Sequence, residues 1–320
     1  MDIIKKMGAL VILMLVCLSS VHAQDSGIPF DFSLSPLFGF LYGQSDEIVY
    51  KFPGKDLYYS KLYWDVKPLF YGGITGGLGP KYPQMRHGFL AELTLRFGLP
   101  LRVGKMDDWD WLNMGLDYPT HYSTHDANSS NSIFADLSAG YSMRLLDRLT
   151  LNISGEFSYM HFSWSANNGY TQYPPPDPSD NYLPWNENYE KKYFSGKVIK
   201  YSQDWLFFSP GISLKWDISR LFALEGFFNY SPLLFCVARD HHLQRKSVFY
   251  DYLFFGRYIK GGGEITFLPL NKTSLLLSAS YRLITGIRGN TYLDSIYYQD
   301  TAGAGYSAID LRLALKFSLL

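Results

Sequence analysis

Two short acidic stretches hold the residues best suited to chemistry. Asp240 and His242 are two positions apart, so on an extended chain both side chains lie on one face. A carboxylate beside an imidazole can fix the tautomer of the ring and raise its basicity, which makes histidine a general base near neutral pH. Asp108 and Asp110 have the same spacing. Two carboxylates held together raise one pKa and can share a proton or bind a water molecule.

Together the two pairs have the groups that a hydrolase with water as its nucleophile needs. His242 would take the proton from water while Asp240 holds the ring. Asp108 and Asp110 would bind the water and stabilise the tetrahedral intermediate through a shared proton. Each pair alone is equally consistent with solvated loop residues, so this hypothesis requires a fold that brings the pairs together.

The start of the chain predicts export. Lys5-Lys6 precede an apolar run, and Val21-His22-Ala23 fits a signal-peptidase site, so residues 1–23 are predicted to be a signal peptide and residues 24–320 one mature domain. Beyond Ala23 there is one thiol, Cys236, which excludes an internal disulfide. After Ala23 there is no run of about 18 apolar residues, so no transmembrane helix is predicted. Basic and acidic residues both number 29, so the charge does not favour nucleic acid as a partner.

Period-two alternation indicates strands of a membrane β-barrel. In residues 309–319 isoleucine, leucine and phenylalanine alternate with aspartate, arginine, lysine and small residues. One face of such a strand suits lipid and the other a polar interior. The pattern recurs over residues 89–98, 133–145 and 149–159, and a helix would not keep period two over these lengths.

The connections alternate between short and long. Short turns are predicted at 146–148, 217–220 and 269–272, and residues 79–87 form an intermediate turn. The fold class is therefore all-β: a transmembrane antiparallel up-and-down β-barrel of about ten strands with long extracellular loops. Because those loops open on one side, both acidic pairs are expected at the same barrel mouth. The long polar segments read as loops are 43–58, 100–131, 167–195, 238–248 and 289–304.

The chain resembles the omptins, a family of outer-membrane endopeptidases built on a ten-stranded barrel. Met106-Asp107-Asp108-Trp109-Asp110-Trp111 is similar to the Met-x-Asp-x-Asp-Trp motif of that family, and Asp240-His241-His242 matches its Asp-x-His motif. The resemblance runs from about residue 39 to the end. It implies that Asp108, Asp110, Asp240 and His242 are catalytic, that water is the nucleophile, and that no metal or cofactor takes part. It also implies peptide or protein substrates at the cell surface, reached from a site that faces the exterior.

The same resemblance implies a substrate pocket for basic side chains, lined by acidic residues. Glu47 matches one of these, and Met106 and Ile199 resemble apolar residues of the pocket. A second acidic position corresponds to Ala238, which is followed by Arg239. Losing a carboxylate and gaining a guanidinium should weaken the binding of Arg or Lys.

A further departure lies near Ser123, a residue that looks like a family serine close to the site. An acidic residue shortly before it is replaced here by His121-Tyr122. Specificity is therefore expected to be relaxed or shifted from the strict dibasic rule. An alternative to the water mechanism has Ser123 as the nucleophile and His242 as the general base that activates it.

Well-known omptins bind lipopolysaccharide through basic residues on the outer wall. The matching positions look like Phe157, Tyr159, His161 and Asp204. Because arginines are missing from them and one is acidic, dependence on the phosphates of this lipid is expected to be weak or absent. A catalytically silent adhesin on the same fold, and a small porin, are the competing functions.

Overall fold

The computed structural model describes residues 30–81, 85–114, 116–175, 181–270, 272–294 and 296–319. The predicted signal peptide, residues 1–23, lies outside them. The described part of the chain consists of fifteen strands in one antiparallel sheet, connected by turns and irregular segments. Within these residues no helix is long and apolar enough to cross a membrane.

The strands are β1 (Phe30–Tyr50), β2 (Tyr58–Pro80), β3 (His87–Gly98), β4 (Arg102–Asp110), β5 (His121–Ser129), β6 (Ile133–Leu146), β7 (Leu149–Gln172), β8 (Lys191–Tyr193), β9 (Lys197–Asp217), β10 (Phe222–Ser231), β11 (Leu234–His242), β12 (Ser247–Phe254), β13 (Arg257–Leu270), β14 (Thr273–Leu293) and β15 (Ile296–Ser318).

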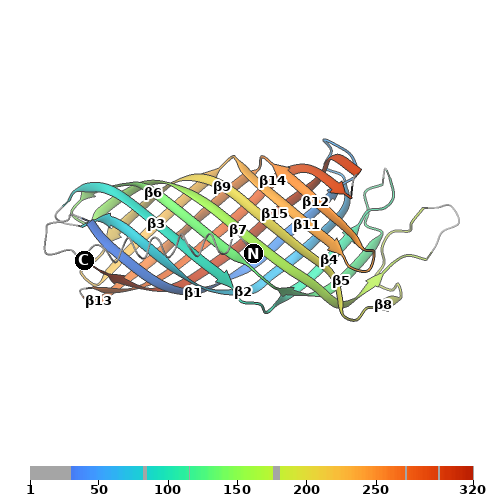
Figure 1. Ribbon diagram of the computed structural model, residues 1–320, viewed down its shortest axis with the longest axis horizontal. Helices are drawn as coiled ribbons and strands as arrows, with labels where there is room; N and C mark the ends of the chain where they lie inside the picture. The colour runs from blue at the N-terminus through green and yellow to red at the C-terminus, as the bar shows by residue number, and fades with distance from the viewer. Residues whose placement is uncertain are drawn as a thin grey trace.

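These elements form ten long barrel strands, as the sequence predicts. Four of the ten are interrupted once: β3 and β4 both pair with β2, β6 and β5 with β7, β10 and β11 with β9, and β13 and β12 with β14. β8 is a short addition to β7. β1 pairs with both β2 and β15, which closes the barrel. Figure 1 shows the strongly tilted strands and, at one end, hairpins that extend beyond the rest.

The predicted turns at 146–148 and 217–220 are confirmed by the β6–β7 and β9–β10 connections. The turns at 269–272 and 79–87 each include residues outside the described part. The bounds of several predicted long loops are wrong, because many of their residues continue the strand pairs, as in β1 up to Tyr50 and β14 up to Leu293. Beyond the bilayer a strand no longer needs an apolar outer face, so its polar sequence resembles a loop.

The half of the barrel next to the short turns carries the apolar belt that lipid requires. On β15, Leu313, Leu315 and Phe317 are exposed on the outer wall, whereas Asp310 is buried inside. This confirms the alternation predicted for residues 309–319, and the belt defines the membrane-spanning part of the barrel. Exposed apolar residues of the belt on other strands are Phe38, Phe89, Leu137, Ile153, Phe208, Ile212, Leu224, Phe228, Ile265 and Leu277.

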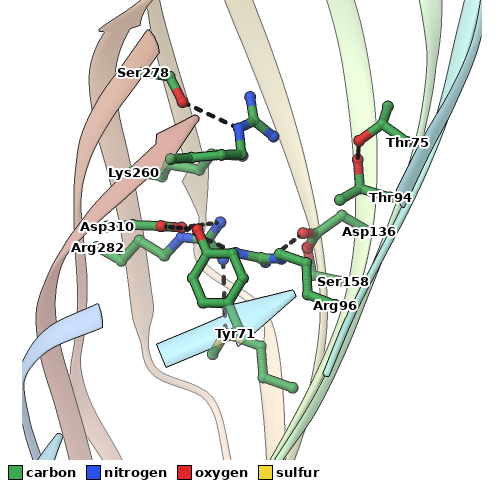
Figure 2. A network of polar contacts seen from close by, with 12 residues as sticks. Tyr71, Thr75, Thr94, Arg96, Asp136, Ser158, Lys260, Ser278, Arg282 and Asp310 are labelled. Carbon is green, nitrogen blue, oxygen red and sulfur yellow. Dashed lines mark hydrogen bonds and ion pairs between the residues drawn. The ribbon is translucent and has the colours of Figure 1, made fainter. Parts of the chain in front are cut away.

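Inside this part, paired charges fill the barrel (Figure 2). The guanidinium of Arg96 lies 2.7 Å from Asp136 and 2.9 Å from Asp310. Arg282 lies 3.2 Å from Asp310, which also accepts a hydrogen bond from Tyr71. Buried charges require partners of this kind, and the network occupies the space that a pore would need.

A layer of aromatic rings separates the network from the other end of the barrel. Trp64 stacks on Tyr201 with ring centroids 5.2 Å apart, and Phe162 stacks on Trp164 at the same separation. On β2, Trp64 lies between Tyr71 of the network and Tyr58, the end of the strand nearest to the long hairpins. The four rings are almost fully buried and form a floor, which we call the aromatic floor.

Candidate active site

Two hairpins carry the predicted catalytic pairs. Asp108 and Asp110 lie on β4 of the β4–β5 hairpin, and Asp240 and His242 lie on β11 of the β11–β12 hairpin. Each hairpin follows an interruption that contains a proline, Pro100 or Pro232. Proline cannot donate to a strand ladder, so the ladder breaks there and resumes in the hairpin.

All four residues line one cavity above the aromatic floor. The cavity has a volume of about 530 Å³, which is in the range of ligand-binding sites in proteins. It brings together residues from two hairpins that are far apart in the sequence. Both members of each pair line the cavity, as the spacing of two residues on a strand predicts.

Asp240 and His242 are in direct contact. Asp240 Oδ2 lies 2.6 Å from His242 Nε2, and the ring of Phe249 packs edge-on against the imidazole at 5.6 Å. Asp240 is 4% exposed, and its other oxygen, Oδ1, is buried without a hydrogen-bond partner among the described residues. The carboxylate therefore fixes the ring through one oxygen and presents an unsatisfied acceptor with the other.

Asp108 and Asp110 share a neighbour, Ser60 on β2. Ser60 Oγ donates a hydrogen bond of 3.0 Å to Asp108 Oδ1. Burial and the charge of Asp110 raise the pKa of Asp108 well above its ordinary value. Burial raises the pKa of Asp110 to about 6, against the lowering effect of the Ser60 hydrogen bond and of Arg245. Such a pair retains a proton in the pH range where most carboxylates have lost theirs.

Glu47 enters the cavity from β1. Trp64 Nε1 in the aromatic floor donates to Glu47 Oε2 at 3.3 Å, and the carboxylate is 4% exposed. Burial, followed by the charges of Asp240 and Asp251, raises its pKa well above the ordinary value. Glu47 is thus a buried carboxylate that other carboxylates surround.

Asp251 on β12 is a lining residue that the sequence reasoning missed. It lies directly opposite Ala238 across the β11–β12 ladder and opposite Thr291 across the β12–β14 ladder. Thr291 Oγ1 donates to Asp251 Oδ1 at 2.7 Å, and burial raises the pKa of Asp251 to about 7. Residues 238–248 were predicted to be a loop, so no pairing of Asp251 with Ala238 was expected. A hairpin with a tight turn after His242 would have predicted that pairing.

The predicted substrate-binding residues divide into two groups. Glu47 and Ile199 line the cavity, whereas Met106 and Ala238 are fully buried and do not belong to its lining. Arg239 is on the outer face, where its guanidinium lies 5.4 Å from the centre of the Tyr250 ring. The expectation that Arg239 adds positive charge to the pocket is therefore wrong, since neighbours of inward residues on a strand point outward.

Ser123 lines the cavity, and it lies opposite Asp108 across the β4–β5 ladder. His121, which precedes it on the same inner face, is buried between the rings of Tyr173 and Tyr182, at 4.4 and 4.7 Å. In the described part of the chain, no three or more His, Cys, Asp or Glu side chains are arranged to hold a metal ion.

The four positions compared with lipopolysaccharide-binding residues lie on the outer wall of β7 and β9. Asp204 Oδ1 accepts a hydrogen bond of 2.6 Å from the Tyr159 hydroxyl and lies 2.8 Å from His161 Nδ1. Phe157 is exposed one step closer to the short turns. The acceptor oxygen of Asp204 is thus occupied by neighbours on the adjacent strand.

Comparison with known proteins places this β-barrel among the outer-membrane proteases. A model of the omptin family matches residues 28–319, and the chain belongs to the omptin family. It is 24% identical to the plasminogen activator of Yersinia pestis over an alignment of 275 residues, which covers 82% of each chain. Its fold is similar to that of the outer-membrane protease OmpT from Escherichia coli, with a TM-score of 0.80 and 18% identity over 93% of this chain and 99% of that one.

Proposed function

We propose that this protein is an endopeptidase that hydrolyses peptide bonds of extracellular proteins or peptides with an activated water molecule. The observation that carries the proposal is the common cavity of Asp108, Asp110, Asp240 and His242. An imidazole held by one carboxylate faces a carboxyl pair that retains a proton, and these are the groups that water-based amide hydrolysis needs.

In the proposed reaction, His242 removes a proton from water, and the oxygen attacks the scissile carbonyl carbon. Asp240 orients the ring and stabilises the imidazolium that forms. The shared proton of Asp108 and Asp110 donates a hydrogen bond to the carbonyl oxygen, which becomes the oxyanion of the tetrahedral intermediate. When the carbon–nitrogen bond breaks, the imidazolium gives its proton to the leaving amine. The products are a free acid and a free amine, and the enzyme returns to its initial protonation state.

The proposed specificity is relaxed from the strict dibasic rule. Ala238 supplies no carboxylate. The two residues before Ser123 are His121 and Tyr122, and the rings of Tyr173 and Tyr182 enclose His121. Lipopolysaccharide is proposed to matter little, because Asp204 would repel a phosphate on the outer wall. The site is proposed to face the exterior, since it lies at the hairpin end of the barrel, away from the short turns.

The test compares purified wild type with Asp108→Asn and His242→Ala on a mixed peptide library. Loss of a general base or acid lowers kcat/KM by about 10²- to 10⁴-fold, and we expect each variant to show this. Asp107→Asn and His241→Ala, which alter the outward neighbours on the same strands, are the matched controls. Equal activity of wild type and both site variants would contradict the proposal and leave the adhesin function.

Two alternatives have their own readouts. Ser123→Ala separates the water mechanism, in which the variant keeps most of its activity, from a serine nucleophile, whose loss abolishes turnover and whose acyl-enzyme gives a kinetic burst. A porin would conduct ions in a planar bilayer. The ion pairs of Arg96 and Arg282 with Asp310 inside the membrane-spanning part argue against it.

A further inference from the structure

The charges of the cavity are distributed unevenly between its two ends. At one end Glu47 and Asp251 lie close to Asp240, as the effect of their charges on one another indicates. At the other end Arg245, on the β11–β12 turn, acts on Asp108, Asp110 and the hydroxyl of Tyr173. One end is therefore acidic, and the other contains a guanidinium next to the carboxyl pair.

We propose that Asp251 and Glu47 form a subsite for one lysine or arginine side chain of the substrate, with Asp251 replacing the carboxylate that is lost at Ala238. We further propose that Arg245 disfavours a second basic side chain on the other side of the scissile bond. The protein would then cleave next to single basic residues rather than between two. This inference rests on the proposed endopeptidase function and names the determinants of its specificity.

The position of Asp251 carries the first step. Its Cα pairs with that of Ala238. The Asp251 carboxylate on β12 therefore enters the cavity beside the position that an acidic residue at 238 on β11 would occupy. The hydrogen bond from Thr291 at 2.7 Å fixes its orientation, and that from Trp64 fixes Glu47. The two carboxylates thus come from separate strands, β12 and β1, and line the same cavity, which allows one cation to contact both.

The missing countercharge carries the second step. Asp251 is 6% exposed and Glu47 4%, and the groups that shift the pKa of Asp251 are its own burial, Thr291 and Asp240, none of which is a cation. Asp240 Oδ1 adds a buried acceptor without a partner among the described residues. Buried carboxylates are costly unless a cation pairs with them, so an entering ammonium or guanidinium would gain strong interactions.

The shape of the cavity suits a long basic side chain. Ile199, which lies opposite His242 across the β9–β11 ladder, lines the cavity and offers an apolar surface to the methylene groups of lysine or arginine, while the charged end reaches the carboxylates. Tyr59 and Tyr173, whose hydroxyl groups feel the charge of Arg245, line the cavity together with Met114. An aromatic or aliphatic side chain fits such a surface, whereas a second cation would meet the charge of Arg245.

The experiment measures kcat/KM for three matched fluorogenic peptides: one with a single arginine before the bond, one with norleucine there, and one with Arg-Arg across the bond. Asp251→Asn keeps the size of the side chain and is expected to lower cleavage of the single-arginine peptide by about 10- to 100-fold, the range for a lost hydrogen bond to a charged group. Cleavage of the norleucine peptide should change little. Arg245→Ala should raise cleavage of the Arg-Arg peptide relative to the single-arginine peptide.

Two further variants make the result decisive. Asp46→Asn, a partly exposed carboxylate of β1 that pairs with Lys61 at 3.6 Å, is the matched control and should leave all three rates unchanged. Ala238→Asp combined with Asp251→Asn moves the carboxylate across the hairpin and should restore the preference for arginine, which also shows that the barrel folds. If wild type cleaves the peptides with no preference for arginine, or Asp251→Asn keeps that preference, this inference fails while the endopeptidase function stands. Failure of wild type to cleave any peptide refutes the function itself.

Discussion

Ser60 Oγ donates a hydrogen bond of 3.0 Å to Asp108 Oδ1, from a strand that pairs directly with the one that carries the aspartates. Asp110 lies opposite Ser60 in the same ladder, and the Ser60 hydrogen bond lowers the pKa of both carboxyl groups. The serine thus moderates the burial that raises the pKa of each. A carboxyl pair that kept its proton too tightly would no longer respond to the reaction.

Ser60→Ala tests this relationship. Without the hydrogen bond the pKa of the pair rises, so the singly protonated form persists to higher pH. The alkaline limb of kcat/KM is therefore expected to move upward, by up to about one pH unit. The measurement is the pH profile of cleavage of one peptide between about pH 5 and pH 9. A downward shift, or a loss of activity at every pH with the limb unmoved, would contradict the assigned role, and Asp107→Asn serves as the control.

Asp251→Asn is expected to stabilise the protein at alkaline pH. Burial raises the pKa of Asp251 to about 7, so the folded state binds its proton more tightly than the unfolded chain does. Its contribution to the free energy of unfolding is fully present below about pH 4 and is lost as the pH rises to about 7. Asparagine carries no such dependence. The variant should gain about 2 to 4 kcal/mol at pH 8 relative to wild type.

Urea unfolding in detergent at pH 4 and pH 8 measures that difference. The gain should be large at pH 8 and small at pH 4. An equal gain at both values would mean that the substitution acts through packing and not through charge. Stability gained with loss of the arginine preference would be the trade-off expected of a binding site that buries unpaired charge.

Much of the barrel could be predicted from alternation alone. The lipid-facing side of residues 309–319 and the common mouth of Asp108 and Asp240 follow from strand parity, because a closed up-and-down sheet allows few arrangements. What could not be predicted depends on pairing across strands. Asp251 reaches the cavity only through the register of the β11–β12 hairpin. The polar residues 238–248 of that hairpin were predicted to be a loop.

Arg239 shows the opposite case, an error that the sequence could have prevented. The rule that placed Asp240 and His242 on one face also places their odd-numbered neighbours on the other. Applied consistently, it would have assigned Arg239 to the outer wall, where it lies near the Tyr250 ring. Met106, predicted to be a pocket residue, follows the inward parity of Asp108 but lies too deep to line the cavity.

The outer wall near Asp204 is expected to give little response to lipopolysaccharide. Asp204 accepts a hydrogen bond from Tyr159 and lies within 2.8 Å of His161 on the outer wall. Its negative charge would repel a lipid phosphate that approached this part of the wall. Activity of the purified protein should change little when lipopolysaccharide is added to the detergent. Activation of the wild type by many-fold would contradict this. Asp204→Ala combined with Phe157→Arg, which removes the repulsion and adds a cation, should create a response where none was present.

Arg96→Met is expected to destabilise the barrel without changing the chemistry of the cavity. Arg96 is 2% exposed and bridges Asp136 and Asp310 at 2.7 and 2.9 Å. Its removal takes away the ion pair that Asp136 makes among the described residues, and breaking a buried ion pair costs about 3 to 5 kcal/mol. The matched control is Lys215→Met, which removes an ion pair of 4.0 Å near a short turn, where the expected loss is about 1 kcal/mol or less.

Urea unfolding in detergent measures both losses, while kcat/KM of the folded fraction should stay unchanged because the aromatic floor separates the network from the cavity. Equal stability of the two variants would mean that the network does not hold the membrane-spanning part together, and a large fall in kcat/KM for Arg96→Met would mean that the floor does not isolate the site.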